Sequence, residues 1–85
     1  MKVPDSVGEL IRRMEQSARD KTMKRFCDQV MRAVTIIWES NRPVKFTYIA
    51  EKLNEPVFRD LEHVLRTIPR IGFHKHKGTI YYVAQ

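Results

Sequence analysis

The 85-residue sequence has few of the residues that build disulfide frameworks, phosphate loops or membrane spans. It contains one cysteine, three glycines and four prolines. A single cysteine excludes an intramolecular disulfide and a multi-thiolate metal site. No apolar run reaches the roughly 18 residues that cross a bilayer, and the first residues lack the apolar stretch of a signal peptide. We therefore expect an intracellular protein with no membrane partner, nuclear if the source is eukaryotic and cytoplasmic otherwise.

The residue sets that support catalysis are also missing. The chain has no glycine-rich phosphate loop and no serine or cysteine in the setting of a nucleophile. Asp60, Glu62 and His63 fall on the outward face of a predicted helix, where solvated charges are the ordinary interpretation. A zinc site needs three or four ligands with orienting partners, which the three histidines do not supply. The sequence predicts a non-catalytic protein without cofactor or metal, in which Cys27 is a buried structural thiol.

The charge balance is basic, and it bears on partners. The chain has sixteen Lys and Arg residues and ten Asp and Glu residues, which gives a net charge of +6. Such a balance indicates a polyanionic partner, with nucleic acid as the first candidate and an acidic protein surface as the second. The chain is 42% hydrophobic and 31% charged, which is ordinary for one globular domain.

Hydrophobic residues recur at helical spacing through the first 40 residues. Ser6 and Glu9 have the spacing of a capping box, and the residues behind them predict a helix over 6–19. A longer match predicts a helix over 21–40, with its apolar stripe at Met23, Phe26, Cys27, Val30, Met31, Val34, Ile37 and Trp38. The two stripes are out of phase and Asp20 can cap the second helix, so we expect a bend near residue 20. One continuous helix is the alternative.

The polar side of the second helix invites two interpretations. It carries Lys21, Lys24, Arg25, Asp28 and Arg32. A solvated face is the simpler interpretation, and a binding surface is the alternative.

The middle of the chain predicts a short strand followed by two compact helices. Residues 44–46 alternate briefly, as an edge strand does. Thr47 is a good N-cap for a helix over 48–53, and Pro56 suits the first turn of a helix over 56–67. The three or four residues between these helices are the spacing of a helix-turn-helix.

The end of the chain predicts a β-hairpin. Residues 71–74 and 79–83 are rich in β-branched and aromatic side chains. Residues 75–78 form the predicted turn, in which Gly78 is free to take a positive φ.

This order of elements predicts a mainly α fold with a small antiparallel β wing. Residues 21–85 would form a winged helix-turn-helix, and residues 1–20 a helical extension. Three short motifs support this assignment by resemblance: FTYIAE at 46–51, IPRI at 68–71 and KGTIYY at 77–82.

Residues 22–83 resemble a winged-helix domain throughout, and the three motifs are similar to the winged-helix core of the beta subunit of general transcription factor E. The resemblance implies double-stranded DNA binding in transcription, together with contacts to transcription-complex proteins.

The hairpin is the strongest candidate for a phosphate-binding site, because its basic residues lie within eight positions that contain no acidic residue. A cationic tip reaches phosphates well, and each contact releases a counterion. His74 and His76 are two apart in a predicted strand, so they share one face. The residues predicted to bind nucleic acid are Arg42, Lys45, Thr47, Arg59, His63, Arg66, Arg70, His74, Lys75, His76 and Lys77.

The predicted recognition helix favours an alternative function. Asp60 and Glu62 stand among its cations and bring its net charge close to zero, which weakens the case for base-specific contacts. A protein–protein interaction module, for docking or dimerisation within a larger nuclear or transcription-related assembly, is therefore the second hypothesis. A homodimer would form through residues 6–40.

Overall fold

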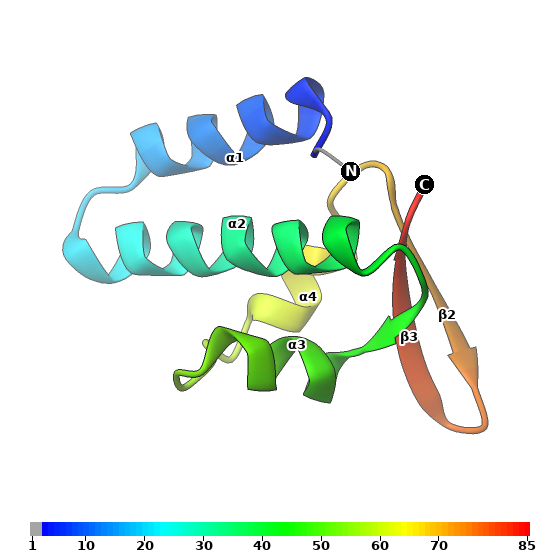
Figure 1. Cartoon of the computed structure of the whole chain (residues 1–85). Helices are drawn as coiled ribbons and strands as arrows, with labels where there is room; N and C mark the ends of the chain where they lie inside the picture. The colour runs from blue at the N-terminus through cyan, green and yellow to red at the C-terminus, as the bar shows by residue number, and fades with distance from the viewer. Residues whose placement is uncertain (1–2) are drawn as a thin grey trace.

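Seven elements of secondary structure make up residues 3–85, the part of the chain that this computed structural model describes. In chain order they are α1 (Asp5–Ser17), α2 (Lys21–Ser40), β1 (Val44–Lys45), α3 (Phe46–Leu53), α4 (Leu61–Leu65), β2 (Ile71–His76) and β3 (Thr79–Ala84). The fold is α+β, with four helices and a small antiparallel sheet (Figure 1).

The predicted break near residue 20 is confirmed, and α2 spans the predicted residues. The Asp20 carboxylate accepts a hydrogen bond of 2.8 Å from the Met23 amide and caps α2. The predicted capping box of Ser6 and Glu9 is wrong. Pro4 occupies the N-cap position of α1 and Ser6 lies inside the first turn, so the Ser6 hydroxyl comes too late to cap the helix.

The sheet has the strand order β1-β3-β2, so the last strand of the chain lies in the middle. Val44 pairs with Tyr82, and the hairpin register runs from Ile71 opposite Ala84 to His76 opposite Thr79. The predicted turn over 75–78 is therefore too long. The turn is Lys77 and Gly78, whose φ angles of 50° and 82° suit a two-residue hairpin turn.

Both compact helices differ from the prediction. The N-cap of α3 is Lys45, not Thr47, because β1 runs directly into the helix and places Thr47 in its first turn. A helix is predicted over 56–67, but the observed helix spans only Leu61–Leu65. Residues 56–58 are irregular because their backbone groups bond to a side chain of α2 in place of helical partners.

That side chain is Gln29, the one polar residue among the buried residues that the structure describes. Its amide nitrogen donates to the Pro56 carbonyl at 3.0 Å, and its amide oxygen accepts from the Phe58 amide at 2.8 Å. Buried backbone groups need such partners. The Gln29 side chain therefore supplies hydrogen bonds to the backbone of residues 56–58, which lie outside any helix.

Arg32, one turn further along α2, holds the start of the same segment. Its guanidinium donates to the Leu53 carbonyl at 2.8 Å and pairs with Glu55. Arg32 is exposed, as the solvated-face interpretation expects, but it also binds the end of α3 and the chain after it, which approach this side of α2.

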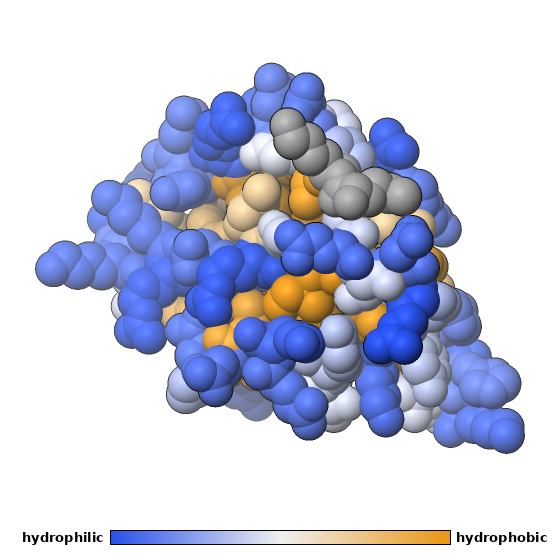
Figure 2. Space-filling view, in the orientation of Figure 1, coloured by the Kyte–Doolittle hydropathy of each residue, from blue (hydrophilic) through white to orange (hydrophobic). Residues whose placement is uncertain are grey.

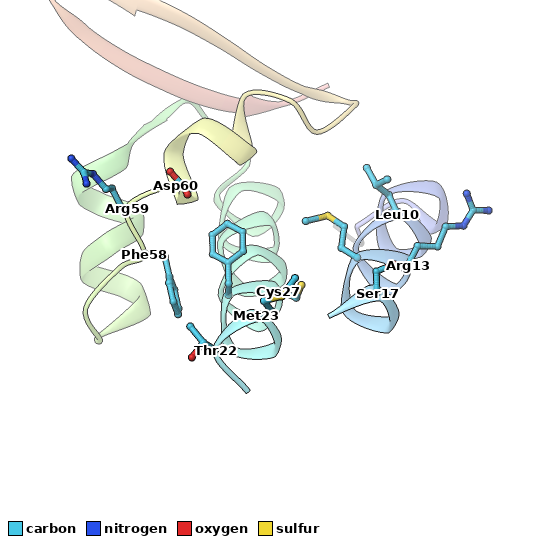
Figure 3. A pocket seen from close by; sticks show the side chains of 11 residues that line it. Leu10, Arg13, Ser17, Thr22, Met23, Cys27, Phe58, Arg59 and Asp60 are labelled. Atoms are coloured by element: carbon cyan, nitrogen blue, oxygen red, sulfur yellow. The ribbon is translucent and has the colours of Figure 1, made fainter. Parts of the chain in front are cut away.

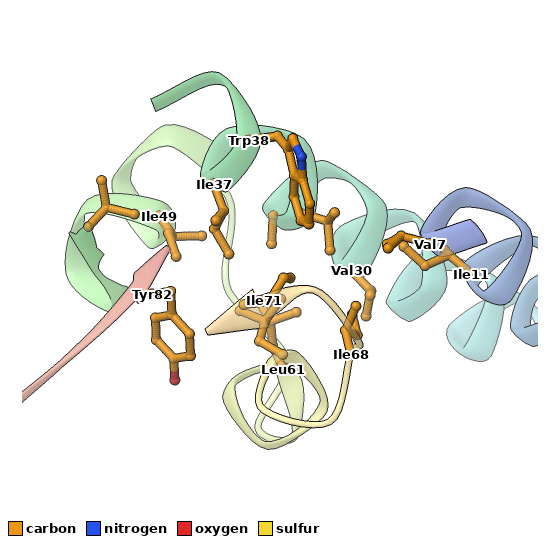
Figure 4. Close-up of a cluster of buried hydrophobic side chains, with 14 of the residues drawn as sticks. Val7, Ile11, Val30, Ile37, Trp38, Ile49, Leu61, Ile68, Ile71 and Tyr82 are labelled. Carbon is orange, nitrogen blue, oxygen red and sulfur yellow. The ribbon is translucent and has the colours of Figure 1, made fainter. Parts of the chain in front are cut away.

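The hydrophobic core lies where α2 meets the other elements (Figure 4). α1 contributes Val7 and Ile11, and the sheet contributes Tyr82. The remaining buried members are Val30, Ala33, Val34, Ile37, Trp38, Val44, Ile49, Leu53, Leu61, Leu65, Ile68 and Ile71. α1 therefore shares one core with the rest of the chain.

The Gln29 bonds yield a stability prediction. Gln29→Ala removes both hydrogen bonds to the partly buried backbone of residues 56–58, so we expect the free energy of unfolding in urea to fall by roughly 1–3 kcal/mol. Gln16→Ala, on the exposed side of α1, is the matched control and should change it by less than about 0.5 kcal/mol. Equal effects of the two substitutions would contradict the role assigned to Gln29.

Candidate nucleic-acid interface

The start of α3 and the end of the hairpin meet around one concavity of about 400 Å³. Its lining is Lys45, Phe46, Thr47, Glu62, Gly78, Thr79 and Ile80. Two segments more than 30 positions apart in the sequence thus face each other, because β1 pairs with β3 and brings the start of α3 beside the hairpin. Of the predicted binding residues, Lys45 and Thr47 line this concavity, and Lys77 precedes Gly78 of its lining in the hairpin turn.

The basic residues of the hairpin lie on both faces of the sheet. His74 and His76 share the outward face, as predicted, and both rings contact Tyr81. Lys75 shares the opposite face with Phe73, which pairs with the buried Tyr82. Lys77 lies in the turn. All of these cationic and titratable side chains are exposed, and the surface at the hairpin end is hydrophilic (lower right in Figure 2).

The structure separates Arg70 from this group. Arg70 precedes β2, and six residues of strand, roughly 20 Å, lie between it and the turn. Its guanidinium donates to the Gln85 carbonyl at 3.1 Å, and its own carbonyl accepts from the Gln85 amide at 2.8 Å. Closeness in sequence does not place Arg70 at the tip, because an extended strand carries it to the opposite end of the hairpin.

Arg42 belongs to a different cluster. Its guanidinium lies 5.9 Å from the centre of the Tyr48 ring, and the Lys52 ammonium lies 5.5 Å from the same ring. Both contacts are cation–π interactions. Sequence reasoning missed Tyr48 and Lys52. Their spacing of four residues, one turn of helix, was the available signal.

Of the binding residues predicted on the recognition helix, only His63 lies in α4; Arg66 follows the helix, and Arg59 precedes it beside the cavity between α1 and α2. Arg59 and His63 are exposed and Arg66 is half-buried. Between them, the Glu62 carboxylate accepts a hydrogen bond of 3.1 Å from the Tyr82 hydroxyl. This bond ties α4 to the middle strand, and it occupies one oxygen of the carboxylate nearest the concavity.

Tyr82 is fully buried, and its ionisation is suppressed. Burial raises the pKa of the Tyr82 hydroxyl well above its ordinary value, and the Glu62 charge and hydrogen bond raise it further. The hydroxyl therefore stays protonated and keeps donating to Glu62 across the physiological range.

A larger cavity, about 650 Å³, lies on the other side of the molecule, between α1, α2 and residues 58–60 (Figure 3). Its lining is Leu10, Arg13, Met14, Ser17, Thr22, Met23, Phe26, Cys27, Phe58, Arg59 and Asp60. Met23 is 45% exposed there, although it belongs to the apolar stripe of α2. We call this surface the α1–α2 groove.

Cys27 lies in the floor of the α1–α2 groove and is buried, as predicted. Burial raises the pKa of its thiol, and the Glu15 carboxylate raises it further. The protonated thiol is the unreactive form, so a packing role fits this position.

Two further classes of site were sought in the structure. Over residues 3–85, no three histidine, cysteine, aspartate or glutamate side chains are grouped closely enough to hold a metal ion. Within the same residues, no helix combines the length and the apolar character that a bilayer crossing requires.

The fold and the site define an α+β domain with a basic hairpin beside the start of a helix. Comparison of the chain with protein-family models, with curated proteins and with solved structures finds no match.

The suppressed ionisation of Tyr82 predicts a stability change in alkali. The unfolded chain releases the tyrosine proton above a pH of about 10, whereas the native state retains it. The bond to Glu62 thus stabilises the fold below that pH, and its contribution is lost as the pH rises further. The free energy of unfolding should fall by up to about 1.4 kcal/mol per pH unit more steeply than in Tyr82→Phe.

Urea titrations of both proteins between a pH of about 8 and 11.5 measure this difference. The two proteins share every other titrating group, so those groups cancel in the comparison. Parallel curves would contradict the assignment.

Proposed function

We propose that this chain is a winged-helix module that binds double-stranded nucleic acid through the phosphate backbone. The order helix, strand, helix, helix, hairpin supports this assignment, as does the sheet in which β1 pairs with the second strand of the hairpin. The hairpin is then the wing, and α3 and α4 form the helix-turn-helix.

The observation that carries the proposal is the meeting of the 45–47 corner with the hairpin end around one concavity. Lys45 lines the concavity, Lys77 precedes Gly78 of its lining in the turn, and Lys75 projects on the inner side of the hairpin. A duplex backbone laid along this concavity meets cations from two elements. The amides at the start of α3 add the positive end of a helix dipole.

The length and charge of α4 argue for backbone binding over base reading. Its five residues extend only about 7 Å, or roughly one and a half turns, so few of its side chains can reach base edges. Asp60 and Glu62 balance Arg59 and Arg66. Phosphate contacts position a protein on a duplex without sequence information, so we propose binding with weak sequence preference, in transcription or a related process with transcription-complex proteins nearby.

The hairpin assignment is tested by Lys75→Ala combined with Lys77→Ala. We expect weaker binding to every duplex sequence and a log–log salt slope lower by roughly 2, because each lost phosphate contact removes about 0.9. Fluorescence polarisation with a random duplex between about 50 and 200 mM salt measures both quantities.

Lys21→Ala combined with Lys24→Ala is the matched control, since it removes the same charge from the far end of α2. Unchanged affinity in the hairpin variant, or the same loss in both variants, would contradict the assignment.

A second candidate function is self-association through the α1–α2 groove. The half-exposed Met23 favours it, as does the mixed charge of a lining that holds Arg13, Arg59 and Asp60. In a two-fold dimer each patch meets a copy of itself, so an arginine of one copy faces the Asp60 of the other. We propose a weak homodimer through α1 and α2.

Sedimentation equilibrium at increasing concentration tests this candidate. Met23→Glu places a charge in the apolar groove and should leave a monomer at concentrations where the parent chain dimerises. Arg12→Glu, on α1 but outside the groove, should leave the equilibrium in place. A parent chain that stays monomeric at the highest concentration would refute the dimer.

A further inference from the structure

The outward face of the sheet carries a row of side chains that spans all three strands. Lys45 stands opposite Tyr81, and Tyr81 stands opposite His74. Directly opposite positions in an antiparallel sheet project on the same face. The neighbouring positions Val44 and Tyr82 are buried against the helices, so this row points away from the core.

The aromatic rings of this row are organised around Tyr81. The His74 ring lies 5.8 Å from it and nearly parallel, at 15°. The His76 ring meets it at 6.5 Å with its edge, at 66°. His74 and His76 are exposed and Tyr81 is half-buried. The sheet thus presents a cluster of aromatic rings to solvent, with His74 and His76 as its most exposed members.

The charge around these rings has one sign. The strands and the hairpin turn contain no aspartate or glutamate, while Lys45, Lys75 and Lys77 lie within or beside them. Cross-strand ring pairs stabilise hairpins, which accounts for one pair. Hairpin stability does not require Lys45 on the third strand, nor the contact of a second histidine, His76, with the Tyr81 ring.

We propose that this face binds a single-stranded nucleic acid, with unpaired bases stacked on Tyr81 and His74 and phosphates contacting Lys45 and Lys77. Aromatic rings on a surface that carries cations are the usual platform for single strands, because every base has a π-face. The bases of a duplex are already stacked on one another and are not free to lie on the sheet. The inference rests on the proposed nucleic-acid function but uses the opposite face of the hairpin from Lys75.

The test compares three labelled probes by fluorescence polarisation with the whole chain: an oligothymidylate of about 12 nucleotides, an abasic strand of equal length, and a duplex. The abasic strand keeps the phosphates and lacks the bases. The oligothymidylate should bind more tightly than the abasic strand. Tyr81→Leu should lower oligothymidylate affinity roughly 5- to 100-fold while leaving the abasic strand and the duplex unchanged.

Tyr81→Phe retains the ring and should bind as the parent does. His74→Ala changes an exposed side chain and should lower oligothymidylate affinity by the same route, which keeps the test decisive if Tyr81→Leu fails to fold. Equal binding of the abasic and thymidylate strands, or unchanged oligothymidylate affinity in His74→Ala and in a folded Tyr81→Leu, would overturn the inference. If the duplex still binds in those cases, the proposed function survives; if no probe binds, both fail.

Discussion

The placement of β3 between β1 and β2 is the constraint on which the other features depend. β3 is the last element of the chain, yet it forms hydrogen bonds with both other strands. Tyr82, in its middle, is fully buried, and its hydroxyl donates a hydrogen bond to the Glu62 carboxylate of α4. One strand therefore fixes the hairpin against the start of α3 and against α4. The concavity and the outward aromatic row both follow from that arrangement.

A second level of organisation comes from polar side chains of α2. Gln29 and Arg32 hold residues 53–58 by their backbone groups, and the Phe26 and Phe58 rings pack edge to face at 5.3 Å. The segment before α4 is thus ordered without being helical. The α4 that results has only five residues, about one and a half turns of helix. This is the physical reason why the proposed binding mode relies on the hairpin and the 45–47 corner.

The two binding modes proposed for the hairpin use its two faces. Alternation along β2 sends Lys75 to the side of the helices and sends His74 and His76 outward. The inner side offers cations beside a concavity, which suits a continuous phosphate backbone. The outer side offers rings, which suit unpaired bases. The α1–α2 groove lies apart from both and leaves them free in the proposed dimer.

The sequence alone determined the helices of the first half, the bend at Asp20 and the hairpin, because periodic apolar residues and capping groups act locally. It also indicated the shared face of His74 and His76, since alternation is a property of any strand. It could not determine the separation of Arg70 from the hairpin tip. It also could not determine the extent of α4, because that depends on hydrogen bonds from Gln29 to residues 27 and 29 positions further along the chain. The central place of Tyr81 likewise depends on strand register. Those features were decided by the tertiary structure, because hydrogen bonds and ring contacts between distant segments form only once the chain has packed.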